Sequence, residues 1–279
     1  MPLSSPMPQN LPSRWSLIAV TAFFLAGASH AQPATAPKPA EPAAQPPAPA
    51  AKTPDINPAT TPVDRKDDWW KQRQAALNER IKQGAEKGDI GILFIGDSIT
   101  QGWEGAGKEV WQKQYAVRNA VNLGIGGDRT QHVLWRLDHG NLDGLDKPSS
   151  GSPPALAVLM IGTNNVHDTK PEQTAEGVAA IVGKLRERLP SMKILVLAIF
   201  PREAKPGELR KKNEKVNERI ALLADNNTVF FRDISPAFLE KDGTLPKEIM
   251  PDELHLSPKG YQVWAEAIEA DVKTLLKEP

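Results

Sequence analysis

The sequence contains no cysteine. Disulfide bonds, zinc sites built on thiolates and a cysteine nucleophile are therefore excluded. The chain also lacks an excess of either charge, because 34 lysines and arginines balance 34 aspartates and glutamates. This balance gives no reason to expect nucleic acid or an anionic membrane surface as a partner. The hydrophobic share of 40% is still enough for a sizeable core within 279 residues.

The first 31 residues have the pattern of a secretion signal. Arg14 supplies a positive charge, and the apolar run that follows (15–28) is about 14 residues long, which is short for a membrane span but typical of a signal core. Ser29-His30-Ala31 places small residues around a cleavage site, so we predict cleavage before Gln32. An uncleaved N-terminal anchor is the alternative. Export without cysteine suits a bacterial periplasmic or secreted protein that has no membrane contact after cleavage.

Residues 32–63 consist mostly of alanine and proline. Proline restricts the backbone and alanine buries little surface, so this segment is expected to be a disordered, semi-extended linker. Asp67-Asp68-Trp69-Trp70 then opens a helical pattern that runs to about Lys87. The two tryptophans could bind the face of a sugar, but we favour a role in pinning this first helix to the domain.

Beyond this helix, short apolar runs alternate with stretches of helical periodicity. Unbroken apolar runs are typical of strands that are covered on both faces, which indicates a parallel sheet. The runs occupy residues 90–95, 120–123, 156–161, 194–199 and 228–231. The amphipathic stretches lie at about 129–138, 172–189, 207–224 and 258–276. This alternation predicts one three-layer α/β domain over residues 64–279.

Active sites of such sheets lie at the carboxyl ends of the strands, so the residues that follow the apolar runs are the candidates. Ser98 follows the first run in Gly96-Asp97-Ser98-Ile99-Thr100, at a turn where its backbone N–H can face an oxyanion. A serine in this place is also a common helix cap. The second run leads into Gly124-Ile125-Gly126-Gly127-Asp128, whose glycines let the backbone approach a ligand closely. Their spacing fits no nucleotide-binding motif.

Three further polar residues complete a set of candidates. Asn164 follows the third run, where its amide can donate to an oxyanion or simply form an Asx turn. Asp252 precedes His255 in a C-terminal turn, so the carboxylate can fold back onto the imidazole and orient it. The pair lacks the further ligands of a metal site, and a surface ion pair is the plain alternative. Taken together with Ser98 and the glycines, these residues favour nucleophilic acyl chemistry.

This order of residues resembles the SGNH hydrolases, also called the GDSL-like esterase and lipase superfamily. The blocks of that superfamily match at Ser98, Gly127, Asn164 and the Asp252–His255 pair, with Gly-Asp-Ser-Ile in place of Gly-Asp-Ser-Leu. Further segments are similar to the catalytic subunits of platelet-activating-factor acetylhydrolase, namely 122–128, 131–137, 162–165, 200–202 and 209–217. The similarity covers roughly residues 65–277, and a longer loop at 149–154 departs from it.

The resemblance implies a flavodoxin-like fold with a five-stranded parallel sheet in the order 2-1-3-4-5. It implies Ser98 as the nucleophile, His255 as the general base and Asp252 as the residue that orients the imidazole. The backbone N–H groups of Ser98 and Gly127, with the amide of Asn164, would form the oxyanion hole. A site of this kind needs no metal and no organic cofactor.

The resemblance also implies a shallow pocket for short acyl groups, and secreted bacterial relatives often remove acetyl groups from polysaccharides. We therefore expect a secreted serine esterase that acts on short-chain acyl esters, above all acetylated glycans. A lysophospholipase or thioesterase, or a non-catalytic glycan-binding subunit, is the alternative. A homodimer is suggested only by the dimeric subunits that the chain resembles.

Several other polar residues are interpreted as structural. Asp97, next to the nucleophile, is expected to hold the turn with its side chain pointing away from the ester. Arg202, His132 and Trp135 are expected to support the fold or the rim of the pocket. His167 follows the Asn164 loop, where it either touches substrate or is simply exposed.

Overall fold

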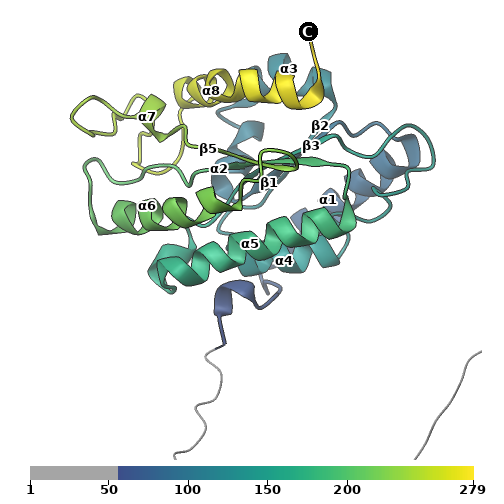
Figure 1. Cartoon of the computed structure of the whole chain (residues 1–279), viewed down its shortest axis with the longest axis horizontal. Coiled ribbons are helices and arrows are strands. Elements are labelled where there is room, and N and C mark those ends of the chain that lie inside the picture. Colours follow the sequence, from purple (N-terminus) through teal and green to yellow (C-terminus); the bar gives the residue numbers. More distant parts are fainter. Residues whose placement is uncertain (1–55) are drawn as a thin grey trace, which may run out of the picture. The chain divides into compact units, whose positions relative to one another are not determined.

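Five parallel strands lie at the centre of the part of the chain that the computed structural model describes, residues 56–279 (Figure 1). The predicted signal peptide and most of the predicted linker lie outside these residues. The strand order is β2-β1-β3-β4-β5, so the predicted fold class and strand order are confirmed. The strands are β1 (Ile92–Gly96), β2 (Ala120–Gly124), β3 (Leu156–Met160), β4 (Lys193–Leu197) and β5 (Val229–Arg232).

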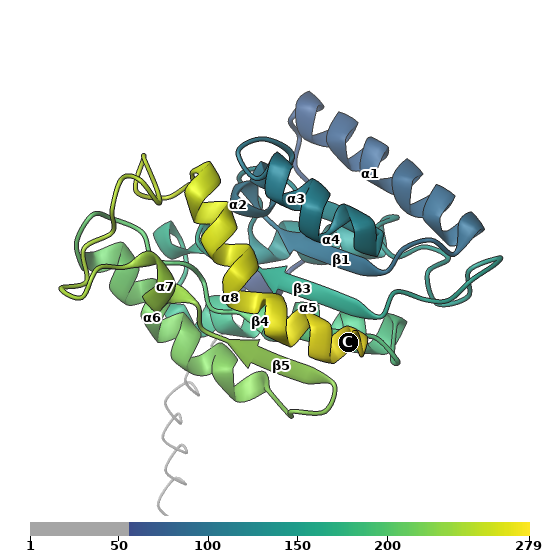
Figure 2. The same ribbon diagram turned by 90° about the horizontal axis from the view of Figure 1, so that it is seen from above.

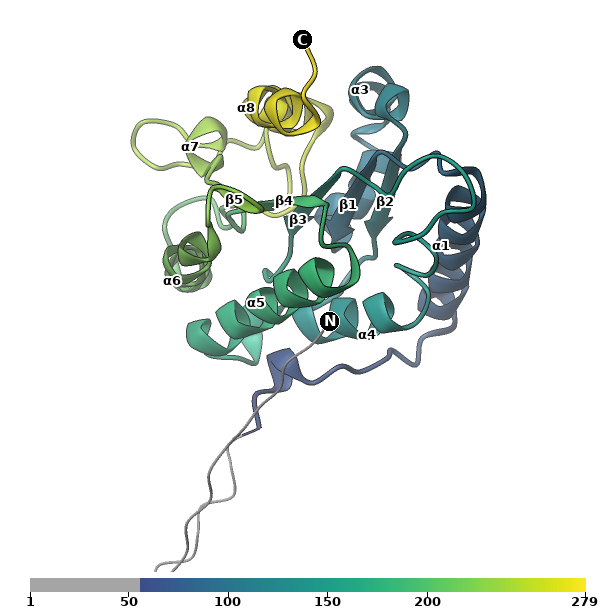
Figure 3. The same cartoon turned by 45° about the vertical axis from the view of Figure 1, so that its right-hand side comes forward.

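Helices cover both faces of the sheet (Figure 3). Leu93 and Ile95 of β1 point into one hydrophobic core, and Ile92 and Phe94 point into the other, as alternation along a strand requires. The first core is closed by α1 (Asp68–Lys87), α4 (Thr130–Asp138), α5 (Pro171–Arg188) and α6 (Glu208–Ile220). The second is closed by α3 (Lys108–Gln114), the short α7 (Ser235–Phe238) and α8 (Pro258–Leu276). The short helix α2 (Ser98–Gln101) follows β1 directly.

The last residues of the predicted linker pack against the domain. Asn57 caps a 3₁₀ turn, Pro58–Thr60, and its amide donates to the backbone carbonyl of Gln173 on α5. The carbonyl of Ala59, which is buried, accepts a hydrogen bond from the Thr130 hydroxyl at the start of α4. These contacts join the segment just before residue 64 to the layer formed by α4 and α5.

The second core contains an unusual number of aromatic rings. Trp103 lies 4.9 Å from Trp264 and 4.6 Å from Tyr261, both on α8, measured between ring centroids. Aromatic side chains bury large areas, and tilted contacts of this kind add to that gain. The rings therefore fix α8 against the segment that follows α2. Within residues 56–279, no helix combines the length and the apolar character needed to cross a membrane.

Candidate active site

Parallel pairing brings the carboxyl ends of β1, β2 and β3 to one end of the sheet, where β1 and β3 are seen side by side in Figure 2. Gly96, the last residue of β1, pairs with Gly124 of β2 on one side and with Met160 of β3 on the other. The segments that follow these residues carry Ser98, Gly127 and Asn164 in turn. The sheet thus gathers three residues that are distant in the sequence, as the strand-end rule predicts.

Ser98, His255 and Asp252 form a continuous chain of hydrogen bonds. The hydroxyl oxygen of Ser98 lies 2.8 Å from Nε2 of His255, and Nδ1 of the same ring lies 2.7 Å from Oδ2 of Asp252. A carboxylate accepts from Nδ1–H, so Nε2 is left free to accept the hydroxyl proton. The structure therefore brings together the serine, the histidine and the aspartate that the sequence indicates.

The position of His255 depends on the start of α8. Ser257 caps this helix by accepting from the backbone N–H of Gly260, so the histidine lies just before a fixed helix terminus. The Tyr261 hydroxyl donates to the carbonyl of Ile99, the residue after Ser98, at 2.6 Å. One buried tyrosine thus joins the elements that carry Ser98 and His255.

Asp252 holds its own loop as well as the imidazole. Its Oδ1 accepts the backbone N–H groups of His255 at 2.7 Å and Leu254 at 3.1 Å. Partial burial would raise the pKa of Asp252, but the hydrogen bonds from the His255 ring and backbone outweigh it and hold the pKa below its usual value. The carboxylate therefore stays charged near neutral pH and can pair with a protonated imidazole.

Asp97 holds the turn that presents Ser98. Its Oδ1 accepts the backbone N–H of Ile99 at 3.0 Å and caps α2, which confirms its predicted structural role. The side chain is fully buried, and this burial raises the pKa of Asp97 to about 7, although the bond from Ile99 opposes the rise. Its second oxygen has no partner among the described residues.

The residues predicted to form the oxyanion hole retain free hydrogen-bond donors or a suitable backbone conformation. The N–H of Ser98 begins α2 and so has no acceptor within that helix. Gly127 has a φ of +73°, a conformation that glycine adopts without strain. Asn164 donates one amide hydrogen to the carbonyl of Asp128 at 2.9 Å, which leaves its second amide hydrogen available. The three predicted oxyanion-hole residues therefore lie around one loop, 124–128.

Side chains at the start of α1 hold this loop. Arg65, just before the helix, donates to the carbonyl of Gly126 at 2.6 Å, and Arg73 donates to that of Gly124 at 2.8 Å. Trp70 is buried and donates its indole N–H to the carboxylate of Asp128 at 2.7 Å. Trp70 thus pins the first helix as predicted, whereas Arg65 and Arg73 were not found from the sequence, since no motif marks them.

A buried ion pair lies beneath the same loop. Arg136 of α4 donates to Asp128 at 2.8 Å, and both side chains are fully buried. The guanidinium also donates to Asn141 at 2.5 Å. Burial raises the pKa of Asp128, while the charge of Arg136 opposes the rise. Removing one partner of such a pair leaves an unpaired buried charge, so the loss of either side chain should destabilise the loop.

Three of the four remaining candidates make contacts that support the fold. Arg202 donates to the backbone carbonyl of Thr163 at 3.1 Å and so holds the Asn164 loop. His132 accepts the backbone N–H of Arg129, and burial lowers the pKa of its imidazole to about 4, which keeps it neutral. Trp135 stacks on His139 with 3.8 Å between the ring centroids. His167 is exposed.

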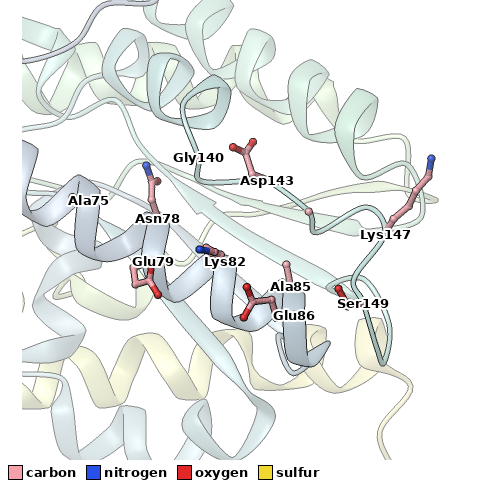
Figure 4. A pocket seen from close by; sticks show the side chains of 11 residues that line it. Ala75, Asn78, Glu79, Lys82, Ala85, Glu86, Gly140, Asp143, Lys147 and Ser149 are labelled. Atoms are coloured by element: carbon pink, nitrogen blue, oxygen red, sulfur yellow. The ribbon is translucent and has the colours of Figure 1, made fainter.

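A cavity of about 610 Å³ lies apart from these residues (Figure 4). It is lined by Asn78 and Lys82 of α1 and by Asp143 and Lys147 of the segment after α4. The end of α1 leads into β1 and the segment after α4 leads into β3. The cavity therefore lies toward the amino ends of these strands and away from Ser98, which follows the carboxyl end of β1. Among residues 56–279, no group of three or more histidine, cysteine, aspartate or glutamate side chains is arranged to hold a metal ion.

The sequence also matches a known protein family. Residues 94–263 match the GDSL-like Lipase/Acylhydrolase family, so the chain is a member of it and is a carboxylic ester hydrolase.

Curated relatives place the chain more closely within the family. Platelet-activating factor acetylhydrolase IB subunit alpha1 of Bos taurus is 37% identical over 225 residues, which cover 80% of this chain and 93% of the relative. The alpha2 subunit of Rattus norvegicus is 35% identical over 225 residues, with coverage of 80% and 94%. The resemblance inferred from the sequence motifs is therefore confirmed.

Solved structures show the same fold. A GDSL-like lipase from Bacteroides thetaiotaomicron superposes with a TM-score of 0.58 at 19% identity, over 73% of this chain and 97% of that one. An acetylxylan esterase from Geobacillus stearothermophilus superposes with a TM-score of 0.52 at 19% identity, over 68% and 97%.

Proposed function

We propose that the chain is an exported bacterial serine esterase that removes short acyl groups, above all acetyl groups, from carbohydrates. One observation carries the proposal: Ser98, His255 and Asp252 form a hydrogen-bond chain, and Asn164 is hydrogen-bonded to the neighbouring 124–128 loop. Acyl transfer by serine needs a base within hydrogen-bond reach of the hydroxyl and a third group that orients the base. The distances meet both conditions.

In the first half-reaction, Nε2 of His255 takes the hydroxyl proton of Ser98 as Oγ bonds to the ester carbonyl carbon. The carbonyl electron pair moves onto its oxygen, where the N–H groups of Ser98 and Gly127 and the amide of Asn164 stabilise it. The bond to the alcohol oxygen then breaks, and that oxygen takes the proton from Nε2. The products are the free alcohol and an acyl-enzyme on Ser98.

In the second half-reaction, water replaces the alcohol. His255 takes a proton from the water as its oxygen attacks the acyl carbon, and the same donors hold the oxyanion again. Collapse breaks the bond to Oγ, which recovers its proton from Nε2. The carboxylic acid leaves, and the resting serine is restored.

The names of relatives support the proposal that the acyl group is acetyl and that the alcohol is a carbohydrate. The alpha1 and alpha2 relatives are named as acetylhydrolases, and a protein of the same fold is named as an acetylxylan esterase. Export is supported by the signal-like segment at residues 1–31. N-terminal sequencing of the protein from a periplasmic extract should begin at Gln32, and a start at Met1 would contradict export with cleavage.

The experiment compares turnover of p-nitrophenyl acetate by the wild type, Ser98→Ala and Ser152→Ala. Ser152 is an exposed serine that precedes the amino end of β3, whereas Ser98 follows the carboxyl end of β1, so Ser152 serves as the matched control. We expect Ser98→Ala to lose activity by at least about a thousandfold and Ser152→Ala to match the wild type. Undiminished turnover by Ser98→Ala would end the proposal.

Two further measurements separate the alternatives. The rate should fall steeply beyond about four acyl carbons, because the shallow pocket that the family resemblance implies would exclude longer chains. A preference for octanoate or palmitate esters would instead favour a lysophospholipase or thioesterase. A fluorophosphonate should label Ser98, whereas a purely glycan-binding subunit would remain unlabelled. Acetate release from a panel of acetylated glycans then identifies the alcohol.

A further inference from the structure

Trp69 is the exposed member of the tryptophan pair at the start of α1. Trp70 is 1% exposed, whereas Trp69 keeps 48% of its surface accessible. The expectation that both residues pin the helix therefore holds for Trp70 alone. An exposed indole in a fixed place calls for another explanation if it lies near the reacting atoms.

Trp69 lies beside the nucleophile, across the space above Gly126. The point that a Cβ would occupy on Gly126 is 3.7 Å from Cβ of Ser98 and 3.9 Å from Cη2 of Trp69. Gln101 closes the same space and accepts the Gly126 N–H at 2.7 Å. Because glycine has no side chain, this space stays open between the serine and the edge of the indole ring.

The indole is held in place although it is exposed. Trp70, the next residue, and Arg73, one turn further along α1, both donate hydrogen bonds to the 124–128 loop. The Arg65 guanidinium lies 5.0 Å from the centroid of the Trp69 ring and is itself bonded to the Gly126 carbonyl and to Asp67. A surface ordered in advance loses little conformational entropy when a ligand binds.

We propose that Trp69 is a specificity-determining residue that stacks against the pyranose ring of the alcohol half of the substrate. This inference rests on the proposed esterase function. The C–H groups on one face of a sugar ring carry partial positive charge, and the face of an indole is negative. A sugar can therefore lie on the ring while its hydroxyl groups stay in water.

The charge around Trp69 favours a neutral sugar over a cationic head group. A quaternary ammonium group would also bind to an aromatic face. Here the Arg65 guanidinium already occupies one face of the ring. A second cation on the same ring would be repelled, whereas a neutral pyranose would not.

The test uses the full chain and compares Trp69→Ala with the wild type on three acetates. The substrates are methyl 2,3,4-tri-O-acetyl-β-D-xylopyranoside, ethyl acetate and acetylcholine, with acid release followed by pH-stat. For the sugar acetate, we expect kcat/KM to fall about tenfold through KM, because stacking binds the ground state and the transition state alike. For ethyl acetate, kcat/KM should stay within about twofold of the wild type. Trp69→Phe should recover most of the loss on the sugar.

Controls separate this inference from the proposed function. Leu222→Ala removes another exposed apolar side chain and should change none of the three rates. Equal losses on the sugar acetate and ethyl acetate would show that Trp69 only supports the loop, and unchanged kinetics on all three would also overturn the inference. A greater loss on acetylcholine would assign the ring to a cation. If the wild type itself hydrolysed none of these esters, the proposed esterase function would fail instead.

Discussion

Replacing Asp252 with asparagine tests the Ser98–His255–Asp252 chain without changing the shape of the loop. Oδ1 of the asparagine can still accept the N–H groups of Leu254 and His255. The amide nitrogen, however, takes the place of Oδ2 and donates instead of accepting. His255 must then present Nδ1 as the acceptor, so Nε2 carries the proton and cannot take another from Ser98.

The expected loss can be worked out from the exposure of the pair. The Asp252 and His255 side chains are 58% and 44% exposed. Opposite charges about 4 Å apart attract by about 1 kcal/mol in water and about 4 kcal/mol at an effective dielectric constant of about 20. A half-exposed pair lies between these limits, and the unfavourable tautomer adds roughly one hydrogen bond, about 1 kcal/mol. A total of about 3–4 kcal/mol corresponds to a loss of about 10²–10³ in kcat.

The assay measures kcat for p-nitrophenyl acetate together with the thermal unfolding midpoint. Asp242→Asn is the matched control, since Asp242 also accepts a backbone N–H, that of Thr244, in an exposed turn. We expect Asp242→Asn to keep full activity and Asp252→Asn to keep a midpoint close to the wild type. A normal kcat for Asp252→Asn would show that the carboxylate does not orient the base. A large fall in its midpoint would trace the loss to the fold of the loop.

Three further predictions concern the oxyanion loop and the turn before Ser98. Asn164→Asp keeps the size of the side chain but removes the donor, so kcat for p-nitrophenyl acetate should fall about 10²–10³-fold; a smaller change than in Asp252→Asn would count against an oxyanion role. In Gly127→Ala, the alanine must adopt a φ of +73°, and its Cβ lies 3.0 Å from a guanidinium nitrogen of Arg65. We therefore expect the free energy of unfolding by urea to fall by about 1–2 kcal/mol and kcat to fall as well. Unchanged stability would contradict this backbone conformation. Burial raises the pKa of Asp97 to about 7, while an unfolded aspartate titrates near about 3.9. The folded state thus holds a proton between these pH values that the unfolded state releases, and the free energy of unfolding should fall by up to about 4 kcal/mol as pH rises from about 4 to about 7. Asp97→Asn should lose this part of the pH dependence, and parallel urea curves for the two proteins at pH 5 and 8 would refute it.

The positions of the strands and the end of the sheet that carries the candidate residues follow from local patterns, whereas the strand order was implied only by the resemblance to the family. Apolar runs ended by Gly96 and Gly124 indicate buried parallel strands, and polar residues after such runs lie at one edge whatever the details of packing. The predicted strands therefore differ from the observed ones by only one or two residues at their ends. Helix α3 was not predicted, because its seven residues contain too few apolar positions to show a period.

The side-chain contacts that hold the 124–128 loop could not be predicted from such local patterns. Asp128 and Arg136 are each ordinary residues in the sequence, and their buried pairing depends on how α4 packs beneath the sheet edge. The hydrogen bond from Arg65, just before α1, to the carbonyl of Gly126 joins residues about sixty positions apart. Side-chain contacts over such separations carry no local period, so pattern arguments do not detect them.

By itself the sequence determined the α/β class and the serine, glycine, asparagine and Asp–His candidates, because each depends on a short pattern with a direct physical meaning. Only the tertiary structure decided that Trp70 is buried on Asp128 while its neighbour Trp69 faces the space beside Ser98. Adjacent residues on a helix point about 100° apart, so one enters the core and the other meets solvent. Which of them does so is settled by the docking of α1 on the 124–128 loop.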